Sequence, residues 1–175
     1  IMVPPGVSFV FFNQKAKDVQ GSLKLVSSYW DWAPRINPDY YYKYFGGTAP
    51  THHLYGLNVA LDMILKEGIE AVWRRHEVLA SAIWAAIESW EKGGELRANI
   101  QDKKLRSAAV TSLQVQTPKG THIRKWLQAN TGLTIGIGLG MATPNDPNGD
   151  GYFRLGHMGH VNAQMTVSYT HLRAH

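Results

Sequence analysis

One arginine lies in a short apolar stretch near the C-terminal end of the chain, where a charged side chain is unexpected. The stretch, residues 153–159, predicts a strand that ends at glycines, with Arg154 buried in its middle. A guanidinium group is always charged, and its planar fork of donors matches a carboxylate in bidentate geometry. We therefore expect Arg154 to bind a small carboxylic acid. The alternative is an internal salt bridge.

A second candidate anion site lies between an aromatic segment and a predicted helix. Gly46 and Gly47 leave the backbone bare, and Thr48 places a hydroxyl beside amide groups near the positive end of that helix. This combination suits a phosphate group. The alternative, that Thr51 only caps the helix, remains open.

Three other candidate motifs lack the residues or the spacing that their function requires. Residues 136–140 alternate glycine with apolar residues, but they lack the spacing of a dinucleotide-binding loop. Residues 146–151 resemble the opening of a calcium loop, yet His157 stands where that loop needs a glutamate. The histidines are too sparse for a metal site, so no metal is expected.

Composition excludes several classes of function. The chain has 175 residues, 44% of them hydrophobic, which is enough for a packed core. It has no cysteine, so disulfides and thiolate metal sites are excluded within it. The formal charge is +5, but basic and acidic residues are interleaved, and we expect no nucleic-acid partner. No apolar run approaches the roughly 20 residues of a membrane span, so no membrane segment is expected.

The first fifty residues predict the edge of a larger structure. Residues 7–12 form a continuous apolar run, typical of a strand buried on both faces within a sheet, and residues 13–17 predict a helical turn. Residues 28–45 are dense in tyrosine and tryptophan and contain Pro34 and Pro38, which predicts a loop. Aromatic residues on an irregular segment are typical of a protein interface.

The remainder predicts long helices followed by a small mixed domain. Apolar residues recur every three or four positions over residues 51–90, with a break at Gly68 and a stop at Gly93 and Gly94. Strands are predicted over residues 108–116, 133–139 and 153–156. A helix capped by Thr121 is predicted over residues 121–130. This order outlines a small α+β domain attached to a larger one.

Four segments, taken together and in order, resemble a known family. They are Pro4-Pro5-Gly6, Gly47-Thr48-Ala49-Pro50-Thr51, the run from Lys66 to His76, and Phe153-Arg154-Leu155-Gly156-His157-Met158-Gly159. The chain resembles the class V aminotransferases that depend on pyridoxal phosphate. The nearest branch looks like the alanine/serine-glyoxylate and pyridoxamine-pyruvate aminotransferases, and the resemblance extends to about residue 165.

The resemblance implies an α/β fold, fold type I of the enzymes that use pyridoxal phosphate, in a homodimer with shared active sites. Residues 1–50 would then end the large cofactor-binding domain, including a dimer-interface loop. Residues 51–94 would be linking helices, and residues 95–166 the C-terminal small α+β domain. Residues 167–175 break the preceding pattern, and we expect them to be a non-native tail.

The resemblance also implies roles for individual residues. Thr48, with Gly47, matches the position that reaches the cofactor phosphate of the partner subunit, and Phe45 falls where some members have a phosphate-binding tyrosine. Arg154 matches the arginine that binds the substrate carboxylate. No catalytic residue is expected in this chain, because the family's Schiff-base lysine would lie just upstream of Ile1.

The expected reaction is transamination with pyridoxal 5'-phosphate. The amino donor would be alanine, serine or pyridoxamine, and the acceptor a small 2-oxo acid such as glyoxylate or pyruvate. The chain would be a fragment, inactive alone, of a cytoplasmic protein, with any targeting segment upstream. The alternatives are a lyase or sulfurtransferase on the same cofactor, and a non-enzymatic binding module that uses the aromatic segment.

Overall fold

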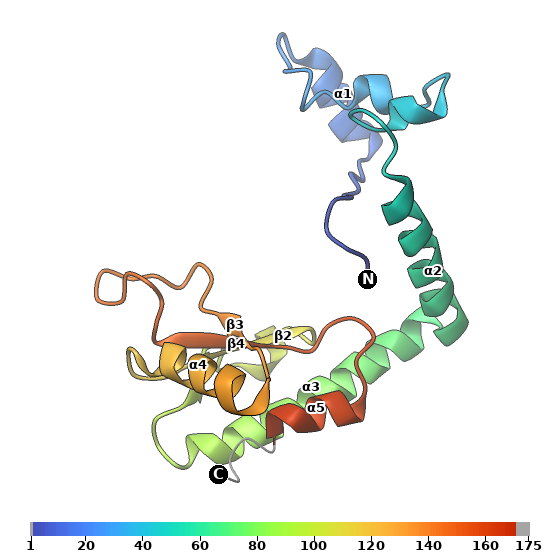
Figure 1. Cartoon of the computed structure of the whole chain (residues 1–175). Coiled ribbons are helices and arrows are strands. Elements are labelled where there is room, and N and C mark those ends of the chain that lie inside the picture. The colour runs from blue at the N-terminus through green and yellow to red at the C-terminus, as the bar shows by residue number, and fades with distance from the viewer. Residues whose placement is uncertain (1, 171–175) are drawn as a thin grey trace. The chain divides into compact units, whose positions relative to one another are not determined.

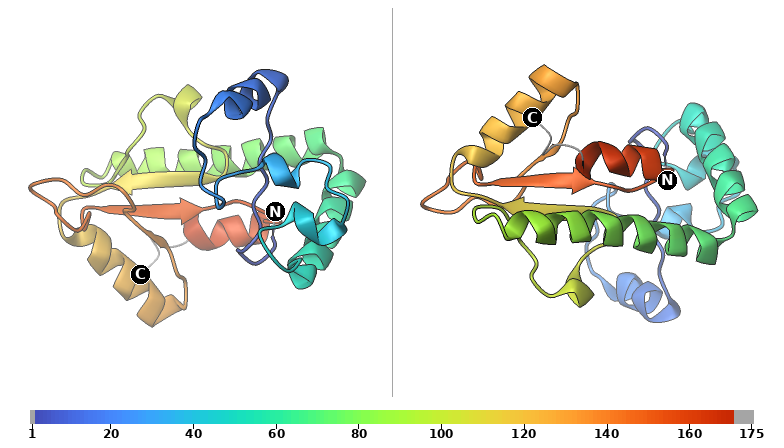
Figure 2. Two further views of the ribbon diagram at one scale, coloured as in Figure 1. Left: turned by 90° about the horizontal axis from the view of Figure 1, so that it is seen from above. Right: turned by 90° about the horizontal axis from the view of Figure 1, so that it is seen from below.

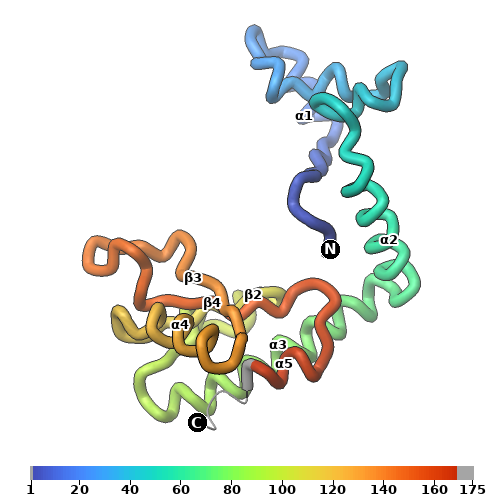
Figure 3. Tube along the Cα trace, viewed as in Figure 1, coloured from blue at the N-terminus to red at the C-terminus, as the bar shows by residue number. Residues whose placement is uncertain are grey.

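A computed structural model describes residues 2–170 of the chain (Figure 1). The contacts between residues divide it into two units, Ile1–Met63 and Ile64–His175. The division falls inside one long helix, whose path can be followed in the backbone trace of Figure 3. The two units are described separately. The predicted domain boundaries refer to a larger protein, and they stay predictions.

The first unit consists of short helical elements joined by loops. Helix α1, Gln14–Ser22, begins where the side chain of Asn13 accepts a hydrogen bond from the Ala16 amide at 3.0 Å. Two 3-10 turns follow, η1 at Ala33–Arg35 and η2 at Tyr41–Tyr44, within the aromatic segment. The helical turn and the loop expected from the sequence are therefore present, and α1 is longer than predicted.

The strand expected over residues 7–12 does not form, which corrects the sequence prediction. These residues have no regular secondary structure, and Phe11 is 91% exposed. A strand that is apolar on both faces is stable only between neighbouring strands, which satisfy its backbone groups and cover its side chains. Within residues 2–170 the sheet contains no strand from this segment.

The predicted helical pair is confirmed, together with its break. Helix α2, Thr51–Glu67, ends before Gly68, whose φ of +86° is unfavourable for other residues, and α3 then spans Ile69–Glu91. Within the second unit, Arg75 of α3 reaches back across the break. Its Nε and Nη2 donate to the two carboxylate oxygens of Glu67 at 2.6 and 2.9 Å. This bond lowers the pKa of Glu67 and holds the two helix ends together.

The second unit contains a four-stranded antiparallel sheet in the order β1-β2-β4-β3. Its strands are β1 (Arg97–Ala98), β2 (Val110–Gln114), β3 (Gly136–Ile137) and β4 (Tyr152–Gly156). Three of them fall within or beside the predicted strands. The sequence analysis missed β1, because two residues are too few to show an alternating pattern.

The core lies on one face of this sheet. Every second residue of β2 and β4 is buried, including Leu113, Phe153 and Leu155, and these side chains pack with Ile83 and Ile87 of α3. Figure 2 shows β2 and β4 side by side with α3 alongside them. The residues between them, Ser112 and Arg154 among them, belong to the other face.

Helix α4, Lys119–Thr131, adds Leu127 to the same core. It begins two residues before the predicted start, and the residue at its N-cap position is Pro118. Thr121 is therefore not the cap, and its hydroxyl instead donates to the carboxylate of Asp150. The helix ends at Gly132 in the left-handed conformation, close to the end predicted at residue 130.

Helix α5, Ala163–Thr170, packs against α3. It includes the first residues of the segment that the sequence analysis treated as a non-native tail. Residues 171–175 of that segment lie outside the described residues.

A buried histidine joins three elements of the second unit. His157 is 1% exposed, and its Nδ1 lies 3.0 Å from the carbonyl oxygen of Ala108, which can only accept, so Nδ1 carries the proton. The hydroxyl of Thr111 then donates to Nε2 at 2.9 Å, while Trp84 Nε1 donates to the same hydroxyl at 3.0 Å. The carbonyl, the imidazole, the hydroxyl and the indole can all form these hydrogen bonds only when the imidazole is neutral.

Burial lowers the pKa of His157, and this predicts how stability depends on pH. Below the unfolded value of about 6.5 the unfolded chain binds a proton that the folded chain does not, so stability is lost as pH falls towards the lower folded value. The loss is at most about 1.4 kcal/mol per pH unit in that window. The urea midpoint of the β2 amide signals in NMR spectra, measured from pH 7.5 to 5.5, checks it. His157→Gln should reduce this slope, and an unchanged slope would contradict the account.

Gly120 provides a second stability prediction, because the backbone after β3 approaches it closely. A Cβ at this position would lie 2.6 Å from the carbonyl oxygen of Asp150 and 2.9 Å from the amide nitrogen of Tyr152. We expect Gly120→Ala to destabilise the second unit by about 1–3 kcal/mol, since backbone atoms must move. Gly156→Ala is the matched control, because its Cβ would meet only Met158 at 3.8 Å. Equal urea midpoints for the two variants would contradict this expectation.

Candidate functional sites

Arg154 occupies the middle of β4, with a strand on each side. Its cross-strand neighbours are Ser112 of β2 and Gly136 of β3. The side chain runs over Gly136, where a Cβ would lie 3.3 Å from the Cβ of Arg154, and Nε donates to the Ile137 carbonyl oxygen at 2.7 Å. The residue is partly buried, whereas the sequence predicted full burial. β4 and β3 therefore fix the stem of Arg154 and one of its donors.

The charge of Arg154 has no counter-ion among the residues that the structure describes. Among the side chains that the structure describes, no aspartate or glutamate forms an ion pair with it. The bond from Nε to a carbonyl oxygen does not neutralise a guanidinium. Of the two interpretations of this arginine, the internal salt bridge is thus not found in the described part of the chain.

Arg154 lines a pocket of about 260 Å³ on the face of the sheet away from the core. Ser107 and Ser112 contribute hydroxyl groups to this pocket, and its apolar lining comes from Ile100, Leu105, Leu139 and Met141. A single free cation among small hydroxyl and apolar groups is suited to a small organic anion. The sequence analysis did not single out Ser112, although its place opposite an arginine follows once the register is known.

The predicted phosphate-binding residues lie in the first unit, where the structure groups two of the three. Phe45 and Gly47 line a pocket of about 320 Å³, whereas Thr48 is exposed and does not line it. The pocket also contains the cations Arg35 and Lys43. Sequence reasoning missed both, because neither stands in a motif.

Arg35 lies beside Gly46 and is hydrogen-bonded to the backbone of Asp31. A Cβ at Gly46 would lie 3.6 Å from Nη2 of Arg35, and the Nη1 group of Arg35 donates to the carbonyl oxygen of Asp31. The Asp31 carboxylate is itself occupied by the Ala33 amide and the side chain of Gln20. Two cations, a bare backbone and the hydroxyl of Ser28 form a donor set that fits a phosphate group.

The segments that resemble a calcium loop and a dinucleotide-binding loop, residues 146–151 and 136–140, have structural roles in the fold. The Asp146 carboxylate accepts the amide groups of Gly151 and Asp150, both at 2.8 Å, and the Gly151 amide holds the pKa of Asp146 below its usual range. Residues 136–140 pass from β3 into a turn, and no helix follows. Throughout residues 2–170, no cluster of histidine, aspartate and glutamate could hold a metal ion.

The aromatic segment and its neighbouring lysines are open to solvent. Tyr29 and Trp30 are more than three-quarters exposed. Lys15, Lys17 and Lys24 are exposed as well, so they lack the apolar surroundings that activate a lysine nucleophile. No described helix is both long and apolar enough to span a membrane.

The chain is similar to known proteins over most of its length. The family profile described as aminotransferase class-V matches residues 1–162. Serine-glyoxylate aminotransferase of Arabidopsis thaliana is 31% identical over 168 residues, which are 93% of this chain and 38% of that protein. The pyridoxamine-pyruvate transaminase of Mesorhizobium japonicum is 28% identical over 164 residues, covering 89% of this chain and 38% of its own length.

Among solved structures, the alanine-glyoxylate aminotransferase of Nostoc sp. superposes with a TM-score of 0.57 and 25% identity, over 71% of this chain and 30% of that one. The chain spans about two fifths of the length of the curated relatives it matches. On the match to residues 1–162, the chain belongs to the class-V aminotransferase family.

Proposed function

We propose that the protein containing this chain is a fold type I aminotransferase that uses pyridoxal phosphate. It would transfer an amino group from alanine, serine or pyridoxamine to a small 2-oxo acid such as glyoxylate or pyruvate. The observation that carries the proposal is the guanidinium of Arg154, which lines a pocket and has no ion pair with an aspartate or glutamate within residues 2–170. Family membership supports the same reaction.

Arg154 binds the carboxylate of the oxo acid in this proposal. Nε is engaged by the Ile137 carbonyl oxygen, which leaves the two Nη groups as a fork for the carboxylate. Because β4 is held by β2 and β3, the carboxylate is bound at a fixed position on the sheet. The hydroxyl of Ser112, opposite Arg154, is placed to bind the same group.

The first unit supplies the residues for the phosphate of the cofactor. Phe45, Gly46 and Gly47 form the wall, and Arg35 and Lys43 supply positive charge. We propose that Thr48, exposed beside this pocket, contacts the phosphate of a cofactor held by a second subunit in a homodimer. When bound, pyridoxal phosphate acts as the electron sink for breaking a bond at the α-carbon of the amino donor. In this proposal, residues of this chain bind two anionic groups, the carboxylate of the oxo acid and the phosphate of the cofactor.

Arg154→Lys tests the carboxylate site on this chain directly. Lysine keeps the charge but loses the planar fork, so the affinity for pyruvate should fall by about tenfold. The dissociation constant is obtained by titrating pyruvate into the labelled chain and following β4 and β2 amide signals by NMR. Arg97→Lys, an exposed change on β1, which pairs with β2 and not with β4, is the control and should bind as the unaltered chain does. Equal affinities for the Arg154 and Arg97 variants would contradict the assignment.

The protein encoded by the whole reading frame is used to test the proposed reaction. We expect a lysine directly before Ile1 in that frame, and the expressed protein should convert glyoxylate or pyruvate to the corresponding amino acid. In this protein Arg154→Lys should raise the KM for the oxo acid. Release of the donor's sulfur or of a cleaved fragment, without amino transfer, would instead establish the lyase or sulfurtransferase alternative. A reading frame without the lysine would contradict both the aminotransferase proposal and the lyase or sulfurtransferase alternative.

A further inference from the structure

The loop of residues 99–107 forms one wall of the Arg154 pocket. Ile100, Leu105 and Ser107 of this loop line the pocket, as does Arg106. The loop connects β1 to β2 and contains only one turn of 3-10 helix, η3 at Lys103–Leu105. A wall without regular secondary structure needs side-chain contacts to hold its shape.

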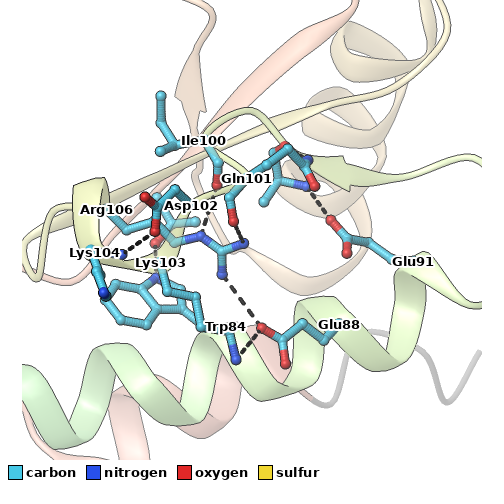
Figure 4. Close-up of polar contacts among 11 residues, drawn as sticks. Trp84, Glu88, Glu91, Ile100, Gln101, Asp102, Lys103, Lys104 and Arg106 are labelled. Carbon is cyan, nitrogen blue, oxygen red and sulfur yellow. Dashed lines mark hydrogen bonds and ion pairs between the residues drawn. The ribbon is translucent and has the colours of Figure 1, made fainter.

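Arg106 provides these contacts from within the loop (Figure 4). Its Nε donates to the carbonyl oxygen of Ile100 at 2.8 Å, and its Nη2 donates to that of Gln101 at 3.2 Å. One side chain thus joins the start of the loop to its end. The planar guanidinium makes both bonds at once, which a lysine ammonium on a flexible stem does not reproduce.

The same side chain is anchored on helix α3. Its Nη1 lies 3.6 Å from a carboxylate oxygen of Glu88, and its guanidinium lies over the ring of Trp84 at 5.6 Å. Lys103 of the loop contacts the same Glu88 oxygen at 2.7 Å. The Arg106 side chain is 5% exposed, so its charge is held in a desolvated position next to a counter-ion.

One further bond fixes the residue that precedes the loop, and another lies in the middle of the loop. Glu91 of α3 accepts the amide of Ala98 at 2.6 Å, and the Asp102 side chain accepts the amide of Lys104 at 2.9 Å. Figure 4 shows Glu88 and Glu91 extending from α3 towards this part of the chain, and the contact between Asp102 and Lys104 within the loop. The loop is therefore fixed to the helix through side chains before any ligand binds.

Two arginines line the pocket, and they differ in charge balance. Arg106 has Glu88 as its counter-ion, whereas Arg154 has none within the described part of the chain. A ligand with one carboxylate can pair with Arg154 and leave Arg106 undisturbed. A second carboxylate would enter a pocket whose other cation already pairs with Glu88, which Lys103 also contacts, and it would lose hydration without gaining an unpaired partner.

We propose that Arg106 is a positioning residue that holds the 99–107 loop against α3, and that its pairing with Glu88 makes the pocket select a monocarboxylate over a dicarboxylate. This inference rests on the proposed carboxylate site at Arg154. It names the substrate class of that site and a residue that acts on the ligand through the loop.

The first test measures whether Arg106 positions the pocket. Propionate is titrated into this chain and into Arg106→Lys, and dissociation constants are taken from NMR shifts. Arg106→Lys keeps the charge beside Glu88 but loses the bonds to two carbonyl oxygens, so propionate should bind about three- to tenfold more weakly. Lys104→Gln removes a charge from the exposed part of the same loop and should leave the affinity unchanged. Unchanged propionate affinity in Arg106→Lys overturns the positioning role.

The second test measures charge selectivity, which a purely structural contact would not alter. Malonate has the carbon number of propionate and a second carboxylate. The ratio of the two dissociation constants is compared between the unaltered chain and Glu88→Gln, which leaves Arg106 without its counter-ion. The ratio should shift towards malonate by about three- to tenfold. This measurement remains decisive if Arg106→Lys fails to fold, and an unchanged ratio overturns the selectivity.

Arg154→Lys distinguishes a failure of the carboxylate site at Arg154 from a failure of the role proposed for Arg106. If this variant binds propionate as tightly as the unaltered chain, the carboxylate site itself is wrong, and the inference is overturned with it. If Arg154→Lys weakens binding while neither Arg106→Lys nor Glu88→Gln changes it, the carboxylate site stands and only the role of Arg106 is overturned.

Discussion

The pairing of β4 with β2 and β3 is the constraint on which both the core and the candidate site depend. Because side chains alternate along a strand, one register places Phe153 and Leu155 in the core and Arg154 on the opposite face. A shift by one residue would bury an uncompensated guanidinium and expose the aromatic ring. The hydrophobic effect that stabilises the second unit therefore also determines where Arg154 lies.

Much of this organisation could be predicted from local patterns. The apolar spacing over residues 51–90 and the glycine at position 68 were sufficient for α2 and α3, because helix periodicity and helix termination are both local properties. Arg154 could be singled out because a charge in an apolar strand is rare. That no acidic side chain in the described part of the chain pairs with it could not be predicted, since pairing depends on which residues the fold brings within about 4 Å.

The elements that sequence reasoning missed depend on distant contacts. Residues 7–12 have the composition of a buried strand, but a strand needs a neighbour, and pairing partners are not encoded in the segment itself. Arg106 stands among charged residues that look like an ordinary solvated loop, yet the fold places it on Trp84 and Glu88. His157 was rejected as a metal ligand, but the sequence does not show that its neutral ring joins Ala108 to Thr111.

The contact between Gly136 and Arg154 has a consequence for the evolution of this family. Arg154 keeps its direction because no side chain stands at position 136, where even a methyl group would lie 3.3 Å from its Cβ. A relative with a larger residue at this position would need a different residue at position 154, or another way to bind its anion. The two positions should therefore change together among homologues. Glycine at 136 would then mark sequences in which the arginine takes the direction it has here.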